Sequence, residues 1–247
     1  MKQLVYMLTF LLVAAPLALA DDHEPLSEQA QQQIQQRTRD MSDAGVPEEP
    51  AQKMLRQMLQ QRFQEENVER AQQVVMQNAE AGLATEPVMN KAMEGMAKGV
   101  DEARILQAME KVQQRQTYSH QVARRLCEDP DAVQAMTDHV YDGLSADMQE
   151  MDVERIAARL EVQTRQQTRN DGEELALQTM QTVRTMARLG AHSTDVGEAV
   201  CQALQHRYSA QQMLQLGNRF ADETQHSPAG SLAQQYARAL GSGEGLG

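Results

Sequence analysis

The chain has 247 residues and a formal net charge of −12, with 35 acidic against 23 basic residues. An acidic balance of this size opposes binding to nucleic acid or to anionic membrane surfaces, because both carry the same sign of charge. Aromatic residues make up only 3% and Trp is absent. The core must therefore be built from Leu, Met, Val, Ile and Ala, which suits packed helices better than a β-sandwich.

Residues 1–20 have the features of an export signal. Lys2 is followed by an apolar run from Leu4 to Ala15, and the segment closes with an Ala-Leu-Ala sequence ending at Ala20. A short basic start, an apolar centre and small residues before a cleavage site define such a signal. The apolar run is too short to span a bilayer comfortably, although a short membrane anchor is the alternative. We expect cleavage after Ala20 and a periplasmic or secreted product with no stable membrane anchor.

Cleavage at that position would leave Asp21, Asp22 and His23 at the amino terminus. A free amine, two amide nitrogens and an imidazole at the third position form the square-planar set of nitrogen ligands that Cu(II) and Ni(II) favour. The triplet therefore predicts a copper or nickel site. The alternative is an N-terminal tail that carries an incidental histidine.

The clearest internal organisation is a pair of similar segments before residue 126. Ala44-Gly45-Val46 recurs 37 positions later as Ala81-Gly82-Leu83, and apolar residues follow at helical spacing in both copies. A glycine at these positions closes the preceding helix, since it adopts positive φ without a steric cost. A repeat length in this range is typical of stacked helical hairpins.

The remaining apolar residues also follow a helical period, and no stretch shows strand-like alternation. We expect a signal peptide at 1–20, an all-helical repeat domain at 21–240 and a flexible tail at 241–247. The approximate hairpin units are 44–80, 81–126, 127–189 and 190–225, with a final helix at 228–240. The predicted fold is all-α, with degenerate hairpin repeats stacked as a short α-solenoid. An irregular helical bundle is the alternative, because the unit lengths vary.

Several polar residues have the positions of helix caps. Ser209 and Gln212 have the spacing of a capping box, and residues 170–172 indicate a break or kink. Asp side chains accept hydrogen bonds from the first free N–H groups of a helix. Three acidic residues are the expected N-caps on this ground: Asp101, Asp129 and Asp152.

The chain contains 16 methionines, and five of them follow helical spacing in the first two hairpins. Met fills irregular core space in a protein that lacks aromatic residues. Met-rich surfaces also form adaptable docking faces for a protein or peptide, and clustered thioethers hold Cu(I). Core packing is the favoured interpretation, and a docking face is the functional alternative. The five residues are Met54, Met58, Met89, Met93 and Met96.

Cys127 and Cys201 are the only cysteines. Two cysteines in an exported protein are a candidate disulfide. The alternative is two buried free thiols, since Cys201 falls among the apolar residues of a predicted helix.

Motifs of known enzymes are absent from the sequence. It has no paired metal-binding histidines on one helix, no nucleophile elbow and no glycine-rich phosphate loop. His139 and Asp142 lie one turn apart, but such pairs on acidic helices are usually solvated. We therefore expect no catalytic residues and no cofactor besides the metal considered above.

These patterns together predict an exported, soluble, non-enzymatic helical repeat protein that binds another protein or a peptide. The alternative is a periplasmic copper- or nickel-handling protein that uses the mature N-terminal Asp21, Asp22 and His23, with Met side chains as additional ligands.

Overall fold

The computed structural model describes residues 27–165 and 167–242, and these form eleven α-helices without a strand. The all-α prediction is thereby confirmed. The signal peptide and the flexible tail lie outside the described residues, apart from the first two tail positions. The helices are α1 Glu28–Asp43, α2 Glu48–Gln60, α3 Glu65–Glu80, α4 Glu86–Ala97, α5 Glu102–Leu126, α6 Pro130–Ser145, α7 Glu150–Thr164, α8 Arg169–Arg188, α9 Ser193–Gln205, α10 Ala210–Glu223 and α11 Ala229–Gly241.

Most of the expected helix starts are confirmed. The Asp101 side chain accepts from the Arg104 N–H, the Asp129 side chain caps α6, and Ser209 with Gln212 forms the capping box of α10. Each side chain satisfies backbone donors that the first helical turn leaves free.

One expected helix start and one expected helix break need correction. Asp152 does not cap α7, because that helix begins at Glu150 after Gln149. Asp152 is instead buried inside the helix, where its carboxylate accepts from Ser193 Oγ at 2.6 Å. The break expected at residues 170–172 is the start of a separate helix, α8, which Thr168 caps. The segment 127–189 therefore holds three helices.

One type of turn closes seven of the described helices. A residue with positive φ follows the helix, and the N–H of the next residue bonds to the carbonyl five positions earlier, which is the Schellman arrangement. At Val46 this N–H reaches the Met41 carbonyl at 3.0 Å. Because the next residue is apolar at every one of these turns, the arrangement also directs a side chain toward the core. The positive-φ residues are Gly45, Arg62, Gly82, Gly99, Asp147, Gly190 and Arg207.

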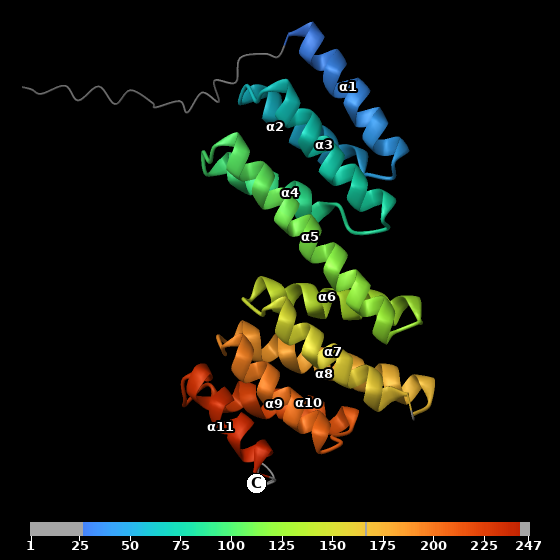
Figure 1. Ribbon diagram of the computed structural model, residues 1–247. Helices are drawn as coiled ribbons and strands as arrows, with labels where there is room; N and C mark the ends of the chain where they lie inside the picture. The colour runs from blue at the N-terminus through green and yellow to red at the C-terminus, as the bar shows by residue number, and fades with distance from the viewer. Residues whose placement is uncertain (1–26, 166, 243–247) are drawn as a thin grey trace, which may run out of the picture.

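The helices stack in two rows, in which a helix packs on the next but one. The odd-numbered helices α1 to α11 contact one another in order, and α6, α8 and α10 do the same in the other row. In this even-numbered row α2 also contacts α4. Helix α6 does not continue the row from α4, because it packs mainly on α5 and α8. The result is an elongated molecule with α1 and α11 at opposite ends (Figure 1).

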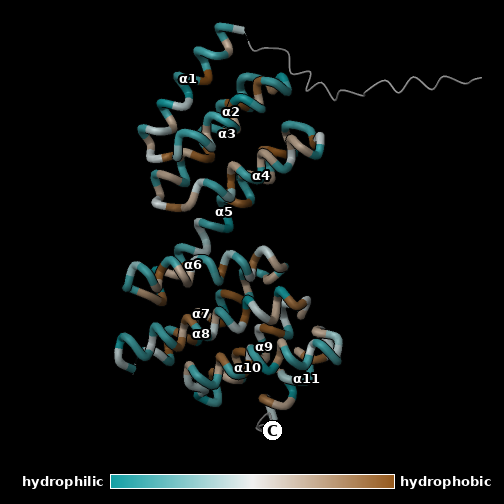
Figure 2. Tube along the Cα trace, turned by 180° about the vertical axis from the view of Figure 1, so that it is seen from behind, coloured by the Kyte–Doolittle hydropathy of each residue, from teal (hydrophilic) through white to brown (hydrophobic). Residues whose placement is uncertain are grey.

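Helix α5 joins two hydrophobic cores. Its first half contributes Ile105 and Met109 to a core shared with α1–α4, and its second half contributes Val122 to a core shared with α6–α11. Between them lies a polar stretch in which Gln116 and Ser119 are buried. Figure 2 shows the hydrophobic positions spaced along each helix with hydrophilic ones between them, as expected for helices that bury one face.

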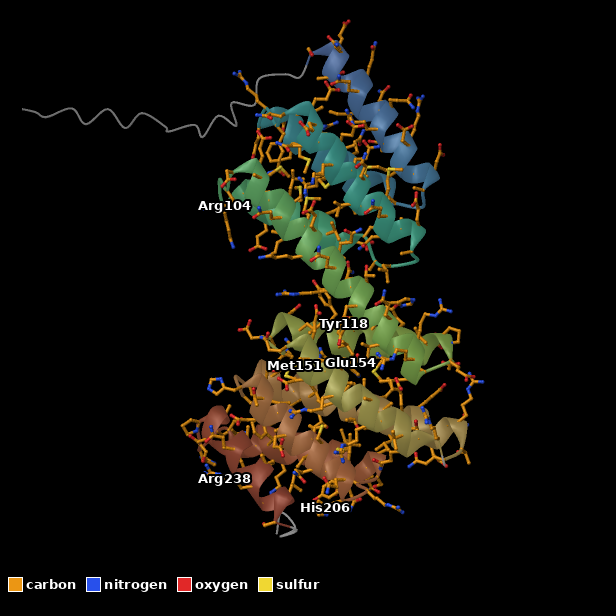
Figure 3. The ribbon with its side chains drawn as sticks, in the orientation of Figure 1. Arg104, Tyr118, Met151, Glu154, His206 and Arg238 are labelled. Carbon is orange, nitrogen blue, oxygen red and sulfur yellow. The ribbon has the colours of Figure 1, made fainter. Side chains whose placement is uncertain are left out.

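Tyr118 fastens α5 to the C-terminal stack. Its hydroxyl donates to the Glu150 carbonyl at 3.0 Å, and Figure 3 shows it beside Met151 and Glu154 of α7. Burial, followed by the neighbouring Glu154 and Glu150 carboxylates, raises the pKa of Tyr118 to about 12. The hydroxyl therefore stays protonated and remains a donor across the physiological range.

Candidate functional site

The methionines considered as a docking face belong to the N-terminal core. Met54 and Met58 are fully buried, Met89 and Met96 are 2% and 3% exposed, and Met93 packs against the same core while partly buried. The docking-face prediction is wrong for the four buried residues, and for the partly exposed Met93 it stays a prediction. Their thioethers fill space between helices that carry almost no aromatic side chains. Core packing, the favoured interpretation of the sequence, is confirmed.

The N-terminal triplet Asp21, Asp22 and His23 lies outside the described residues, so the copper or nickel site stays a prediction. Residues 27–165 and 167–242 contain no group of three or more His, Cys, Asp or Glu side chains that could hold a metal ion.

Cys127 and Cys201 are both free and buried. The sequence left open a disulfide or two buried free thiols, and the structure contains the two free thiols. Burial, followed by the nearby Glu173 and Asp129 carboxylates, raises the pKa of Cys127 to about 12. Burial also raises the pKa of Cys201, while Arg155 and Arg159 act in the opposite direction. Neither thiol is therefore disposed to ionise, which is what a nucleophile or a metal ligand requires.

His139 and Asp142, which lie one turn apart on α6, have different surroundings. Asp142 is bound to Arg184 Nε at 2.7 Å and to Arg188 at 3.4 Å. His139 is largely buried, and its Nδ1 has no hydrogen-bond partner. Burial lowers the pKa of His139, which favours the neutral ring. The Asp142 carboxylate therefore belongs to an ion-pair network between α6 and α8.

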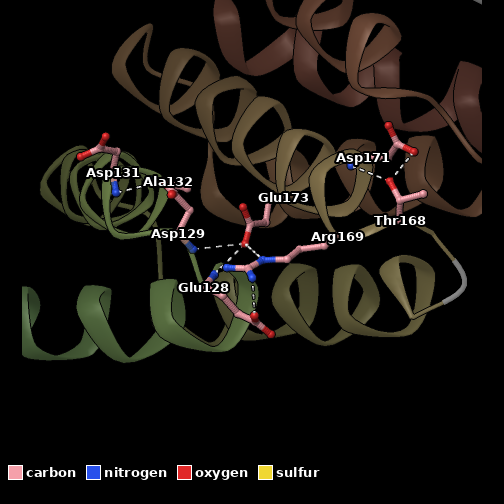
Figure 4. A network of polar contacts seen from close by, with 8 residues as sticks. All are labelled: Glu128, Asp129, Asp131, Ala132, Thr168, Arg169, Asp171 and Glu173. Atoms are coloured by element: carbon pink, nitrogen blue, oxygen red, sulfur yellow. Dashed lines mark hydrogen bonds and ion pairs between the residues drawn. The ribbon is translucent and has the colours of Figure 1, made fainter.

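Glu173 organises a second polar network, at the start of α8 (Figure 4). One of its oxygens accepts from the backbone N–H of Glu128 at 2.7 Å and of Asp129 at 3.3 Å, and from Arg169 Nε at 3.3 Å. The Glu128 N–H is the main cause of a lowered pKa at Glu173. This network holds the α5–α6 turn against α8, and within it Arg169 forms ion pairs with both Glu128 and Glu173.

A surface groove between α7 and α9 differs from these paired sites. It encloses about 510 Å³, a size within the range of ligand-binding clefts. One wall is formed by Arg159, Val162 and Gln163 of α7, with Gln167 beyond the end of that helix. The other wall and the floor come from the end of α9 and the following turn: Leu204, Gln205, Arg207, Tyr208 and Ser209.

Local structure fixes both walls of this α7–α9 groove. Arg159, Val162 and Gln163 have the three- and four-residue spacing that places side chains on one helix face. Arg207 has a φ of 57°, and the Tyr208 N–H bonds to the Ala203 carbonyl at 3.1 Å, which closes α9. Tyr208 is half-buried and packs on the C-terminal core. The turn therefore presents Arg207 to solvent beside an anchored tyrosine.

The α7–α9 groove is free of acidic side chains, and its two arginines are unpaired. No ion pair joins Arg159 or Arg207 to a carboxylate in the part of the chain that the structure describes. Elsewhere arginines are commonly engaged: Arg125, for example, binds Glu154 and Glu161 at 2.8 and 2.6 Å. Since Glu161 turns toward α5 in this way, it does not neutralise the groove. Two cationic side chains thus face a common hollow in a strongly acidic protein.

Apolar surface accompanies these charges. Val162 is 65% exposed, which is rare for a large apolar side chain in the described residues, and the buried Leu204 lines the same groove. A smaller hollow of about 280 Å³ begins at Tyr208 and continues over Gln212, Gln215, Leu216 and Arg219 of α10. Tyr208 is therefore shared by two adjoining hollows, and the combined surface crosses three helices.

The sequence reasoning missed this groove, because its walls are contributed by segments far apart in the chain. One signal was present: residues 199–221 contain no Asp or Glu, although acidic residues outnumber basic ones by 35 to 23 overall. That gap could have directed attention to Arg207. It could not have shown that Arg159 lies across from it.

Comparison of the chain with protein-family models, with curated protein sequences and with solved structures finds no match. None of the described helices combines the length and the apolar character that crossing a membrane requires.

Proposed function

We propose that the chain is an exported, non-enzymatic helical scaffold that binds another protein or a peptide, and that the α7–α9 groove is its binding surface. The observation that carries the proposal is the exposed Val162 beside the anchored Tyr208 in a groove of about 510 Å³. A half-buried tyrosine with an apolar neighbour is the kind of rigid contact on which protein recognition depends. The glutamines around it offer both hydrogen-bond donors and acceptors.

The same residues argue against catalysis in the groove. Its lining contains no His, Cys, Asp or Glu, which are the usual general acids, bases and nucleophiles. Ser209 Oγ is occupied in the α10 cap, where it accepts from the Gln212 N–H at 3.3 Å.

We further propose that the scaffold is a short α-solenoid of degenerate hairpins. The support is the packing of a helix on the next but one from α1 to α11 in the odd-numbered row and from α6 to α10 in the other, together with the same turn at seven helix ends. Helical hairpins bury their apolar faces on their neighbours, so such arrays present extended surfaces to partners.

Export to the periplasm or out of the cell is part of this proposal and rests on the segment 1–20. Determination of the N-terminus on protein isolated from the producing cell tests it, with Asp21 expected as the first residue. An intact leader on the protein in its final location would remove this part of the proposal.

Site-specific photo-crosslinking tests the binding function. A benzophenone amino acid placed at position 162 is expected to capture a discrete partner in the native compartment. The matched control is position 151 on the same helix, since Met151 is also apolar and is 78% exposed but does not line the α7–α9 groove. Absence of a discrete adduct at 162, or the same adducts from both positions, would contradict the proposal.

A further inference from the structure

The α7–α9 groove carries information on the chemistry of its partner. Arg159 and Arg207 approach it from opposite walls, neither has a carboxylate partner within the described residues, and no acidic side chain lines the groove. We propose that this surface, as the binding site of the proposed function, takes an acidic segment of a partner protein. Its carboxylates bind Arg159 and Arg207, and a neighbouring apolar side chain packs on Tyr208.

Guanidinium chemistry supports carboxylates as the charged groups. Arg presents a planar fork of N–H donors that matches a carboxylate in a bidentate pair, and it keeps its charge at any physiological pH. Where Arg125 meets acids in this protein, it adopts such an arrangement, with Nη1 and Nη2 donating to the two oxygens of Glu154 at 2.9 and 2.8 Å. Arg159 and Arg207 lack such a partner, so an incoming carboxylate would supply it.

Apolar contact distinguishes a peptide from a simple anion. Val162 and Tyr208 border the arginines, and the adjoining hollow continues from Tyr208 to Leu216. Arg219 in that hollow is already engaged by Glu223 at 2.7 Å. The positive charge is therefore concentrated at the α7–α9 end, and the α10 end offers an apolar and amide surface. A segment with acidic residues followed by an apolar residue complements both parts.

The charge of the rest of the chain argues against nucleic acid as the occupant. A duplex carries phosphates continuously along its length, so its charge would extend past a groove with two free arginines. The stretch from Leu126 to Glu154 contains nine acidic residues and no Lys or Arg, and the whole chain has a net charge of −12. A long polyanion would meet this repulsion, whereas a short acidic segment confines its charge to the groove.

Fluorescence polarisation with defined peptides tests the proposal on the full chain. The probe is a labelled peptide, Gly-Glu-Glu-Leu-Gly-Glu-Glu-Leu-Gly, and its counterparts replace every Glu by Gln or by Lys. The acidic probe is expected to bind at least about tenfold more tightly than the Gln probe. Its affinity is expected to fall when the salt concentration is raised from about 0.05 to 0.5 M. Equal binding of the Glu and Gln probes, or no binding of the acidic probe up to about 1 mM, overturns the proposal.

Variants locate the contact. The double variant Arg159→Gln, Arg207→Gln is expected to abolish the preference for the acidic probe. The control Arg104→Gln, Arg238→Gln removes the same charge from exposed residues outside the groove (Figure 3) and is expected to retain it. Circular dichroism of both variants shows that the fold is intact. The assignment is overturned if both double variants lose the preference for the acidic probe equally, or if Arg159→Gln, Arg207→Gln keeps it. It is also overturned if a labelled single-stranded oligonucleotide binds as tightly as the acidic probe and Arg159→Gln, Arg207→Gln abolishes that binding.

The two proposals fail separately. A discrete photo-crosslink from position 162, combined with no preference for the acidic probe, overturns acidic recognition and leaves the binding function standing. Absence of that crosslink removes the binding function itself.

Discussion

The side chains of Asn78 and Gln116 form a buried hydrogen bond of 2.6 Å between α3 and α5. Both amides also donate to one backbone carbonyl, that of Ala84, at 3.0 Å. The pair therefore fixes the turn between α3 and α4 against the middle of α5, close to the point where the two hydrophobic cores separate. Asn78 is fully buried and Gln116 is 6% exposed, so the bond is sheltered from water.

Replacement of either amide is expected to destabilise the fold. Asn78→Leu and Gln116→Leu should each lower the free energy of unfolding by about 1–3 kcal/mol, because each leaves a buried polar partner with fewer hydrogen bonds. The double variant should lose less than the sum, with a coupling of at least about 0.5 kcal/mol. Urea denaturation of the four proteins measures this cycle. Strict additivity would mean that the two side chains do not act together.

The Glu173 network should make stability depend on pH. The lowered pKa of Glu173 means that its ionised carboxylate stabilises the folded state at pH values above 4.5, the ordinary pKa of a glutamate. This contribution is lost as the pH falls through the lower folded-state pKa. Glu173→Gln is expected to cost about 1–2 kcal/mol near about pH 7, with a difference from the wild type that shrinks below about pH 4.5.

Unfolding by urea across this pH range measures the effect. Glu174→Gln is the matched control, since Glu174 is the exposed neighbour and is expected to change stability little. A cost for Glu173→Gln that stays constant to low pH would contradict the role assigned to the carboxylate.

The recurring turn predicts opposite effects at two positions. Asp147 has a φ of 69°, which a β-carbon disfavours, so Asp147→Gly should stabilise the protein by about 0.5–1 kcal/mol. Gly190 has a φ of 92° with open space around it, so Gly190→Ala should destabilise by about 1–2 kcal/mol through the backbone alone. Thermal unfolding followed by circular dichroism reads both. The same sign for both variants would be inconsistent with this account.

The state of the cysteines can be counted directly. Without reductant, two thiols per chain should react with a thiol reagent once the protein is denatured. In the folded protein both should react slowly, because Cys127 and Cys201 are only 3% and 7% exposed. Cys127→Ser should leave one reactive thiol under denaturing conditions. If denatured wild-type protein showed no reactive thiol until reductant was added, the two cysteines would be bonded.

Local interactions explain which features could be predicted from sequence. Gly45 and Gly82 ended their helices as expected, because the left-handed conformation is a property of a few neighbouring residues. The Ser209 capping box was also predictable, since both partners lie within one turn. The buried position of Asp152 was not predictable, because its partner outside its own helix is Ser193 of α9. A long-range hydrogen bond drew into the interior a residue whose type and position suggested a cap.

The sequence alone determined the all-helical character, the residues that begin or end several helices, and the need for methionine in the core, because all three follow from side-chain chemistry over a few turns. Tertiary structure decided that Met54, Met58, Met89 and Met96 are buried, that Cys127 and Cys201 remain separate, and that Arg159 and Arg207 border one groove. These outcomes depend on how helices distant in the chain pack together. Side-chain periodicity shows that a helix has an apolar face, but only packing determines which surface remains open beside it.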